Sequence, residues 1–283
     1  MSRLIVNADD FGLTQGVNQA VIELFRDHAL TSTTLMATAD NFDEAVALAK
    51  QSPSLGVGCH VVLVDGMPVL PSSEIPSLID ISAPNKSVFR AKLSTFVTDL
   101  LRGRISEAEI EAEATAQVKK LQQAGIAVTH IDTHKHTHTF PRVLRPLLQA
   151  ALACGVKAIR NPFEPNWSLN ATANGGHVRK MQVRLLRSQS ATFSQEVTSS
   201  GILTTDGAIG VLATGTLDAQ TIENLLAAMP DGTWELVCHP GYNDAALQQQ
   251  NTRLLASRDV ERAALLETIP GANCDLIHFG QLA

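Results

Sequence analysis

A cluster of imidazoles lies near the middle of the chain, in the segment HIDTHKHTHTF at residues 130–140. Four of the nine histidines are found here, at His130, His134, His136 and His138, together with Asp132. Such a cluster can hold a metal ion, titrate as a pH switch, or form a polar segment without chemistry. The H-x-H spacing alone is a weak signal, so residues elsewhere in the chain have to decide.

Other residues able to bind a metal or move a proton stand where apolar, strand-like runs end. These positions are Asp9 and Asp10 after LIVNA, His60 after LGVGC, Asp132 and His134 after AVTHI, Arg160 after VKAI, and His239 after WELVC. In parallel α/β folds the carboxyl ends of the strands meet on one side of the sheet, where the loops build the site. Five such ends predict one shared pocket.

Strand geometry sorts the histidine-rich segment further, because successive side chains face opposite ways. His130, Asp132 and His134 therefore share one face. His134 lies nearest the carboxyl end and is the best metal ligand of the three, whereas Asp132 is placed to orient a ligand imidazole. His130 lies deeper and is expected in the core. His136 and His138 follow in the next loop, where one of them is expected to line the pocket.

The adjacent carboxylates of Asp9 and Asp10 would face apart on a continuous strand. Both reach one site only if the chain turns there, and Phe11-Gly12 directly after them supplies a break. Two like charges side by side are costly unless a cation or a proton separates their roles. A metal ion bound to one aspartate, with the other left as a base, removes that cost.

The elements that must position these residues alternate between short apolar runs and helical patterns. Strands are expected at residues 3–8, 30–37, 55–63, 126–132, 156–161, 207–213, 234–240 and 274–279, and clear helical patterns at 15–28 and 107–125. Repeated alternation of this kind predicts a parallel sheet. With about eight strands, a distorted (β/α) barrel in a single domain over residues 1–283 is favoured over an open sheet.

Two segments interrupt the alternation and are expected to be long loops. Residues 64–85 contain four prolines and follow a strand, and residues 161–176 have a similar composition. Loops of this length in a compact domain often act as lids over a site.

Composition excludes several functional classes. The 283 residues carry a formal net charge of −6, which argues against non-specific nucleic-acid binding. The N-terminal residues resemble no signal peptide, and no apolar run is long enough to span a bilayer, so a cytoplasmic protein is expected. The four cysteines are far apart and form no CxxC pair, so free thiols are expected and a thiolate zinc site is not.

The motifs match a known family in their order along the chain. RLIVNADDFGLTQGVNQAVIE, LTSTTLMA, SLGVGCHVVLVDGMPVLP, THIDTHKHTHTFP and ELVCHPGY resemble those of the YdjC-like carbohydrate deacetylases, over residues 3 to about 280. The segment HVVLVDGMPVLP is most similar to the hopanoid-biosynthesis-associated branch of that family. The resemblance implies a distorted (β/α) barrel related to the NodB-type polysaccharide deacetylases.

The resemblance also implies an activity, the metal-dependent removal of an acetyl group from an N-acetylated amino sugar. By the family's pattern, Asp10, His60 and His134 hold the metal. A site of two imidazoles and one carboxylate keeps coordination positions open, as a hydrolytic metal requires. Ligands of this type suit Zn²⁺ or Mg²⁺ best, and also Mn²⁺, Co²⁺ or Ni²⁺, so the sequence does not choose the ion.

The roles expected in that reaction follow from the remaining residues. Asp9 is the candidate general base and His239 the candidate acid for the departing amine, with His138 or His136 as alternatives. Arg160 either depresses the pKa of a catalytic carboxylate or makes a surface salt bridge. Rival functions are a metal-dependent phosphoesterase, disfavoured because no basic cluster stands beside the metal motifs, and a non-catalytic metal-dependent sugar-binding protein.

The expected partner is a small molecule or glycolipid that contains N-acetylglucosamine, and in the hopanoid branch the sugar sits on a lipid. The basic segment HVRKMQVRLLR at residues 177–187 is either an amphipathic helix packed on the barrel or a contact with an anionic membrane surface. A homo-oligomer is expected, and nucleic acid is not an expected partner.

Overall fold

The structure is a computed structural model that describes residues 2–84, 87–173 and 176–282. Its centre is a parallel sheet with strand order β4-β3-β2-β1-β6-β5, and β7 pairs with the start of β1. The strands are β1 (Ser2–Phe11), β2 (Ser32–Leu35), β3 (Gly56–Val61), β4 (Val128–Thr133), β5 (Gly207–Ile209), β6 (Gly232–Cys238) and β7 (Asp275–Leu276).

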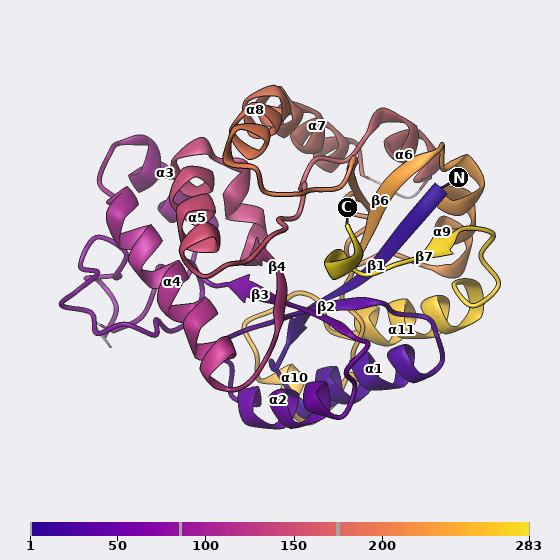
Figure 1. Cartoon of the computed structure of the whole chain (residues 1–283), viewed down its shortest axis with the longest axis horizontal. Coiled ribbons are helices and arrows are strands. Elements are labelled where there is room, and N and C mark those ends of the chain that lie inside the picture. Colours follow the sequence, from indigo (N-terminus) through magenta and orange to yellow (C-terminus); the bar gives the residue numbers. More distant parts are fainter. Residues whose placement is uncertain (1, 85–86, 174–175, 283) are drawn as a thin grey trace.

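Helices surround this sheet (Figure 1). They are α1 (Gln15–Arg26), α2 (Phe42–Lys50), α3 (Leu93–Leu101), α4 (Glu107–Gln123), α5 (Pro141–Ala153), α6 (Asn166–Ala171), α7 (His177–Leu186), α8 (Ser190–Ser200), α9 (Ala219–Ala228), α10 (Ala245–Gln248) and α11 (Ala256–Thr268). Helix α1 contacts both α2 and α11, whereas α4 and α5 pack together on another side of the sheet.

The predicted fold class, a distorted (β/α) barrel of mostly parallel strands, is confirmed. Between β4 and β5, however, the ring is continued by single bridges, from Ile131 to Ile159 and from Ala158 to Leu203. The expected strand at 156–161 is therefore reduced to these bridges. The apolar run VKAI is only four residues long, and Arg160 at its end turns inward to a cluster of carboxylates.

Local sequence signals explain where α1 and α4 begin and where α4 ends. The side chain of Thr14 accepts a hydrogen bond from the backbone N–H of Val17 and caps the start of α1. Ser106 caps α4 in the same way through the backbone N–H of Glu109. Gly125, which adopts a φ of +85°, follows α4 at the position where a left-handed residue ends a helix.

The two expected lid loops have different outcomes. In the described part of residues 64–85, Asp65, Gly66 and Met67 line a cavity that Asp10 and His60 also line, as expected of a lid. The described part of residues 161–176 contributes no residue to that cavity, and six of its residues form α6. These described residues do not meet the expectation of a second lid, and Phe163 and Leu169 among them are buried in the core instead.

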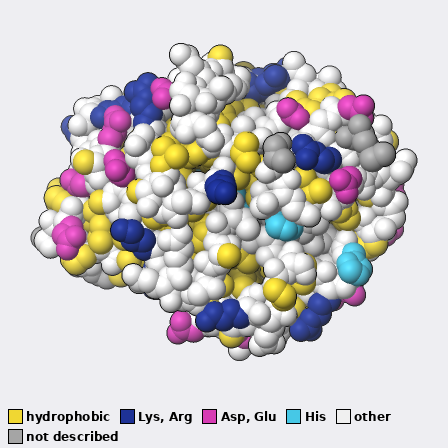
Figure 2. Space-filling model, in the orientation of Figure 1, with side chains coloured by type: hydrophobic (Ala, Val, Ile, Leu, Met, Phe, Trp, Pro, Cys, Tyr) yellow, Lys and Arg dark blue, Asp and Glu magenta, His cyan; other side chains and the backbone are white. Residues whose placement is uncertain are grey.

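The basic segment at residues 177–187 begins with a helix, α7, as expected. Two of its apolar side chains, Met181 and Leu186, are exposed, and the side chains of Val178 and Leu185 lie outside the described residues. No helix in the described part of the chain is both long and apolar enough to cross a membrane. On the face in Figure 2, Lys and Arg side chains are scattered among acidic ones and form no continuous basic patch.

Candidate metal centre

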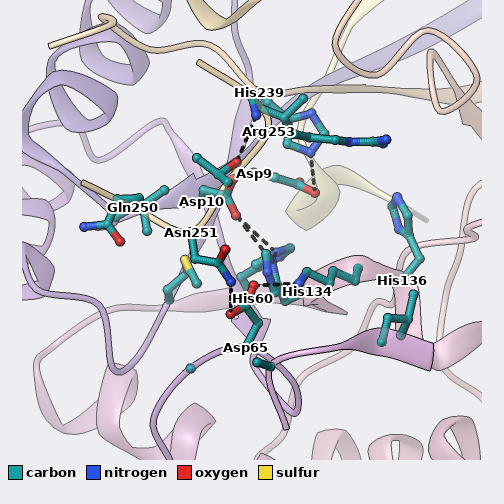
Figure 3. A pocket seen from close by; sticks show the side chains of 18 of the residues that line it. Asp9, Asp10, His60, Asp65, His134, His136, His239, Gln250, Asn251 and Arg253 are labelled. Atoms are coloured by element: carbon teal, nitrogen blue, oxygen red, sulfur yellow. Dashed lines mark hydrogen bonds and ion pairs between the residues drawn. The ribbon is translucent and has the colours of Figure 1, made fainter. Parts of the chain in front are cut away.

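A cavity of about 830 Å³ opens beside the carboxyl ends of β1, β3, β4 and β6. Its wall contains most of the residues expected to do chemistry, namely Asp9, Asp10, His60, His134, His136 and His239. Figure 3 shows these side chains converging from separate elements, with Asp65, Gln250, Asn251 and Arg253 around them. The strand ends thus meet in one pocket.

The two adjacent aspartates reach the cavity because the strand is distorted between them. Asp10 adopts a φ of +67°, in the left-handed region that few residues other than glycine enter. The pairing of β1 with β2 shifts register between Ala8 and Phe11, which is the signature of a bulge. The turn that the sequence required therefore lies at Asp10 itself, just before the expected break.

Asp10, His60 and His134 form a triangle of ligand atoms. Asp10 Oδ1 lies 3.6 Å from both His60 Nε2 and His134 Nδ1, and the two imidazole nitrogens are 3.3 Å apart. Ligand atoms roughly 2.0–2.1 Å from a tetrahedral Zn²⁺ lie about 3.3 Å from one another. The three side chains therefore fit one face of a tetrahedral ion, and the fourth position would point toward the cavity.

The imidazole of His60 is oriented by a carboxylate on its other nitrogen. Asp132 Oδ1 lies 2.8 Å from His60 Nδ1, and Thr34 Oγ1 lies 3.2 Å from the same nitrogen. Such a carboxylate–histidine pair fixes the ring so that Nε2 faces the ion. Burial lowers the pKa of His60, but the carboxylates of Asp132 and Asp9 outweigh it and raise that pKa to about 9.

Asp9 is tied to the guanidinium of Arg160, which is fully buried. Arg160 Nη1 and Nη2 donate to the two oxygens of Asp9 at 2.9 and 2.6 Å, in a fork-to-fork pair. The same guanidinium contacts Asp132 and donates through Nε to Glu235 at 2.8 Å. Burial alone would raise the pKa of Asp9, but Arg160 lowers it far below its usual range, so Asp9 remains ionised.

Asp9, His60 and Asp132 form a second group close enough to share an ion. Arg160 already lies between Asp9 and Asp132 and supplies the positive charge there. A cation at that position would have to displace a buried guanidinium, which is strongly unfavourable. The triangle around Asp10 is therefore the better metal site.

His239 directly follows β6, and its imidazole lies close to the carboxylate of Asp9. Its Nε2 lies 3.8 Å from Asp9 Oδ2, and its backbone N–H donates to Glu261 Oε2 at 2.6 Å. Burial lowers the pKa of His239 to about 4, although Asp9 and Asp10 partly oppose the shift, so the ring is neutral near pH 7. Burial also raises the pKa of Glu261, to about 7.

The remaining histidines of the central segment separate into three environments. His136 lines the cavity, and both it and Lys135 have left-handed backbone angles. His138 is buried against Thr133 and Phe193 and does not line the cavity, so of the two alternative acids only His136 reaches the cavity wall. His130 stacks on Phe279 with ring centroids 3.8 Å apart, as a core residue does.

Sequence inspection missed three charged residues of the site, Glu235, Arg258 and Glu261. Arg258 donates to Asp10 Oδ2, and both it and Glu261 come from α11, not from a strand end. They lie three residues apart on the buried face of that helix, together with Leu265. Charged residues at helical spacing on an otherwise apolar face were the signal that could have revealed them.

Comparison with known proteins decides the family. The family described as YdjC-like protein matches residues 3–269 of the chain. The chain belongs to the YdjC-like family. A carbohydrate deacetylase of Brevibacillus brevis is 33% identical over 288 residues, which cover 99% of each chain. A chitooligosaccharide deacetylase of Salmonella paratyphi C is 31% identical, over 87% of this chain and 84% of that protein.

Solved structures share the fold of the YdjC-like chain. A protein of Enterococcus faecalis described as a cellobiose-phosphate cleavage protein superposes with a TM-score of 0.76 at 25% identity, over 98% of this chain and 97% of that one. A lactam utilization protein of Thermus thermophilus gives a TM-score of 0.53 at 14% identity, over 97% and 99% of the two chains, which is a likeness of fold.

The raised pKa of His60 predicts how metal binding depends on pH. In the metal-free protein this imidazole keeps its proton up to about pH 9, and a metal ion must displace that proton. Affinity for Zn²⁺ should therefore rise with pH, by about tenfold per pH unit for one released proton, over the range pH 7 to 8.5. Competition titration against a chromophoric chelator measures this slope.

A matched control for that titration is His28→Asn. His28 is exposed, far from the site in the chain, and has a left-handed backbone that asparagine tolerates. Its replacement should leave the slope unchanged, whereas His60→Gln should abolish tight binding. An affinity that does not vary with pH in the unmodified protein would contradict the displacement of a proton from His60.

Proposed function

We propose that the protein is a metal-dependent hydrolase that removes the N-acetyl group from an N-acetylated amino sugar. The observation that carries the proposal is the Asp10–His60–His134 triangle beside the ionised carboxylate of Asp9 in one cavity. Relatives named carbohydrate deacetylase and chitooligosaccharide deacetylase, at 27–33% identity over most of the chain, support this activity.

Asp10, His60 and His134 would hold a divalent ion, and Zn²⁺ or Mg²⁺ are the first candidates. When bound, such an ion acidifies water and polarises the acyl oxygen of the amide. Two imidazoles and one carboxylate would leave one position of a four-coordinate ion open, and zinc can expand to five ligands to take both groups. A ligand set of nitrogen and oxygen atoms without thiolate is typical of hydrolytic centres.

Asp9 would serve as the base for water, because Arg160 keeps this carboxylate ionised and therefore able to accept a proton. The proton has a short route onward, because His239 Nε2 lies 3.8 Å from Asp9 Oδ2. His239 is neutral near pH 7 and can accept a proton on this nitrogen. Once protonated, it can donate to the departing amine, so one imidazole closes the proton cycle.

We further propose that the sugar is carried on an apolar aglycone, with a hopanoid glycolipid as the substrate indicated by the sequence resemblance. The cavity supports this because one part of its wall is apolar, formed by Met36, Met67, Val88, Phe89 and Leu93. A lipid-linked sugar could place its ring at the polar end and its aglycone along these side chains. Anionic membrane surfaces are the matching partner proposed for α7. The expectation that the protein forms a homo-oligomer stays a prediction.

A phosphoesterase is the less favoured alternative. Two arginines do stand beside the candidate ligands, although no basic cluster was expected from the sequence. Arg160 is committed to three carboxylates and has no free pair of donors for a phosphate. Arg258 donates to Asp10 and Leu254 but has no partner for Nη1, and Arg253 also lines the cavity. The deacetylase names of the relatives are therefore what makes the phosphoesterase the less favoured alternative.

A screen of N-acetylated substrates tests the function directly. Purified protein with added Zn²⁺, Mg²⁺, Mn²⁺, Co²⁺ or Ni²⁺ should release acetate and free amine from an N-acetylglucosamine conjugate, and chelation should abolish the reaction. The glycolipid should give a higher kcat/KM than diacetylchitobiose. A phosphomonoester should not react. Metal-dependent sugar binding without acetate release would favour the non-catalytic alternative.

Asp9→Asn tests the proposed base. The amide keeps the size of the side chain but cannot accept the proton, so kcat should fall by about 100-fold or more at saturating metal, with Zn²⁺ affinity changed only a few fold. Thermal denaturation checks folding, since this change also weakens the pair with Arg160. Glu196→Gln is the control, because Glu196 pairs with the exposed Arg145 far from the cavity. Near-normal deacetylation in the asparagine variant would assign the base elsewhere.

Liposome flotation tests the membrane proposal for α7. With anionic vesicles the protein should float, and with neutral vesicles it should not, because electrostatic attraction adds to the burial of apolar side chains such as Met181. Replacement of Lys180 and Arg184 by glutamine should reduce flotation. Absence of binding to both vesicle types would remove membrane contact from the proposal.

A further inference from the structure

Asp10 offers only one of its two oxygens to the candidate metal site. Oδ1 faces His60 and His134 at 3.6 Å, whereas Oδ2 accepts a hydrogen bond of 2.5 Å from Nη2 of Arg258. Arg258 is 1% exposed, so this charge-assisted bond is sheltered from water. The side chain of Asp10 is therefore held on both sides.

Arg258 has a second partner that fixes the guanidinium itself. Its Nε donates to the backbone oxygen of Leu254 at 3.1 Å. Leu254 ends the segment 250–254, all of which lines the cavity, and Asn251 in that segment donates to Asp65 at 2.9 Å. Asp65 in turn pairs with Lys135, which directly follows His134. The contacts of Arg258 thus join Asp10 to the rim of the cavity.

We propose that Arg258 is a positioning residue that keeps Asp10 a one-oxygen ligand. This inference rests on the proposed metal site. A carboxylate with both oxygens free can chelate an ion and fill a second coordination position. Hydrolysis of an amide needs positions for water and for the acyl oxygen, so chelation by Asp10 would compete with the reaction. Arg258 prevents this by occupying Oδ2.

The fork of arginine suits this task better than the single ammonium of lysine. Nε and Nη2 hold the Leu254 oxygen and Asp10 Oδ2 together, with a planar geometry that leaves little freedom. Lysine could keep the charge on Asp10 but not both bonds. Methionine matches the unbranched aliphatic part of the arginine side chain and would leave Oδ2 without a donor.

The experiment compares Arg258→Met and Arg258→Lys with the unmodified protein. Crystal structures of the zinc-loaded proteins give the number of Asp10 oxygens bound to the ion, and kcat is measured at saturating metal on the substrate found in the screen. The methionine variant should bind zinc through both oxygens and lose at least tenfold in kcat. The lysine variant should bind through one oxygen and stay within fivefold.

The control is Arg262→Met, one turn further along α11. Arg262 pairs with Glu23 and stacks on the ring of Tyr242, outside the cavity wall, so its loss should change neither coordination nor kcat. Circular dichroism checks the fold of each variant, and Arg258→Leu, which also removes the donor to Asp10, replaces the methionine variant if that variant does not fold.

Two results would overturn the inference. One is a methionine variant in which zinc still binds a single oxygen of Asp10 with kcat within threefold of the unmodified protein. The other is a lysine variant that chelates zinc or loses as much activity as the methionine one. Failure of the unmodified protein to bind metal through Asp10 is a separate result, which would overturn the proposed metal-dependent function itself.

Discussion

The pairing of carboxylates with one buried guanidinium is the constraint on which the rest of the site depends. Arg160 contacts Asp9, Asp132 and Glu235, and all four side chains are nearly or fully buried. Isolated charges in such a place would cost several kcal/mol each, and removal of one partner from a buried network commonly costs about 3–5 kcal/mol. Burial together with Asp9 and Asp132 raises the pKa of Glu235 to about 7, even against the effect of Arg160.

The guanidinium of Arg160 fixes the carboxylates that it contacts and, through one of them, an imidazole that it does not contact. Asp132 uses one oxygen for Arg160 and the other for His60 Nδ1, so the guanidinium indirectly fixes the imidazole that faces the candidate metal. Asp9 is held by the same group through both of its oxygens. The proposed division of roles between Asp9 and Asp10 therefore corresponds to the arginine that each aspartate contacts, Arg160 or Arg258.

The sequence predicted the fold class and the metal-binding and proton-transfer residues of the cavity wall that follow strands, because both depend on local patterns. Polar residues after apolar runs located His60, His134 and His239, and the steric conflict at Asp9 and Asp10 required the turn that Asp10 makes. The sequence could not predict the role of α11, because no local pattern states which strand end a distant helix will face. It could not choose between His136 and His138 for the cavity wall, because the left-handed backbone of Lys135 and His136 has no clear signal in the sequence.

The single bridges that continue the barrel between β4 and β5 give electrostatics a part in holding the fold together. Residues 158–159 and 203 contribute only a few ladder hydrogen bonds there, far fewer than a full strand. Arg160 sits at the edge of this gap and reaches across the interior to Asp9 on β1 and Glu235 on β6. Outward movement of the 157–160 segment would leave carboxylates in the interior without their cation, so the ion pairs of the candidate site also hold together a part of the barrel that has few strand hydrogen bonds.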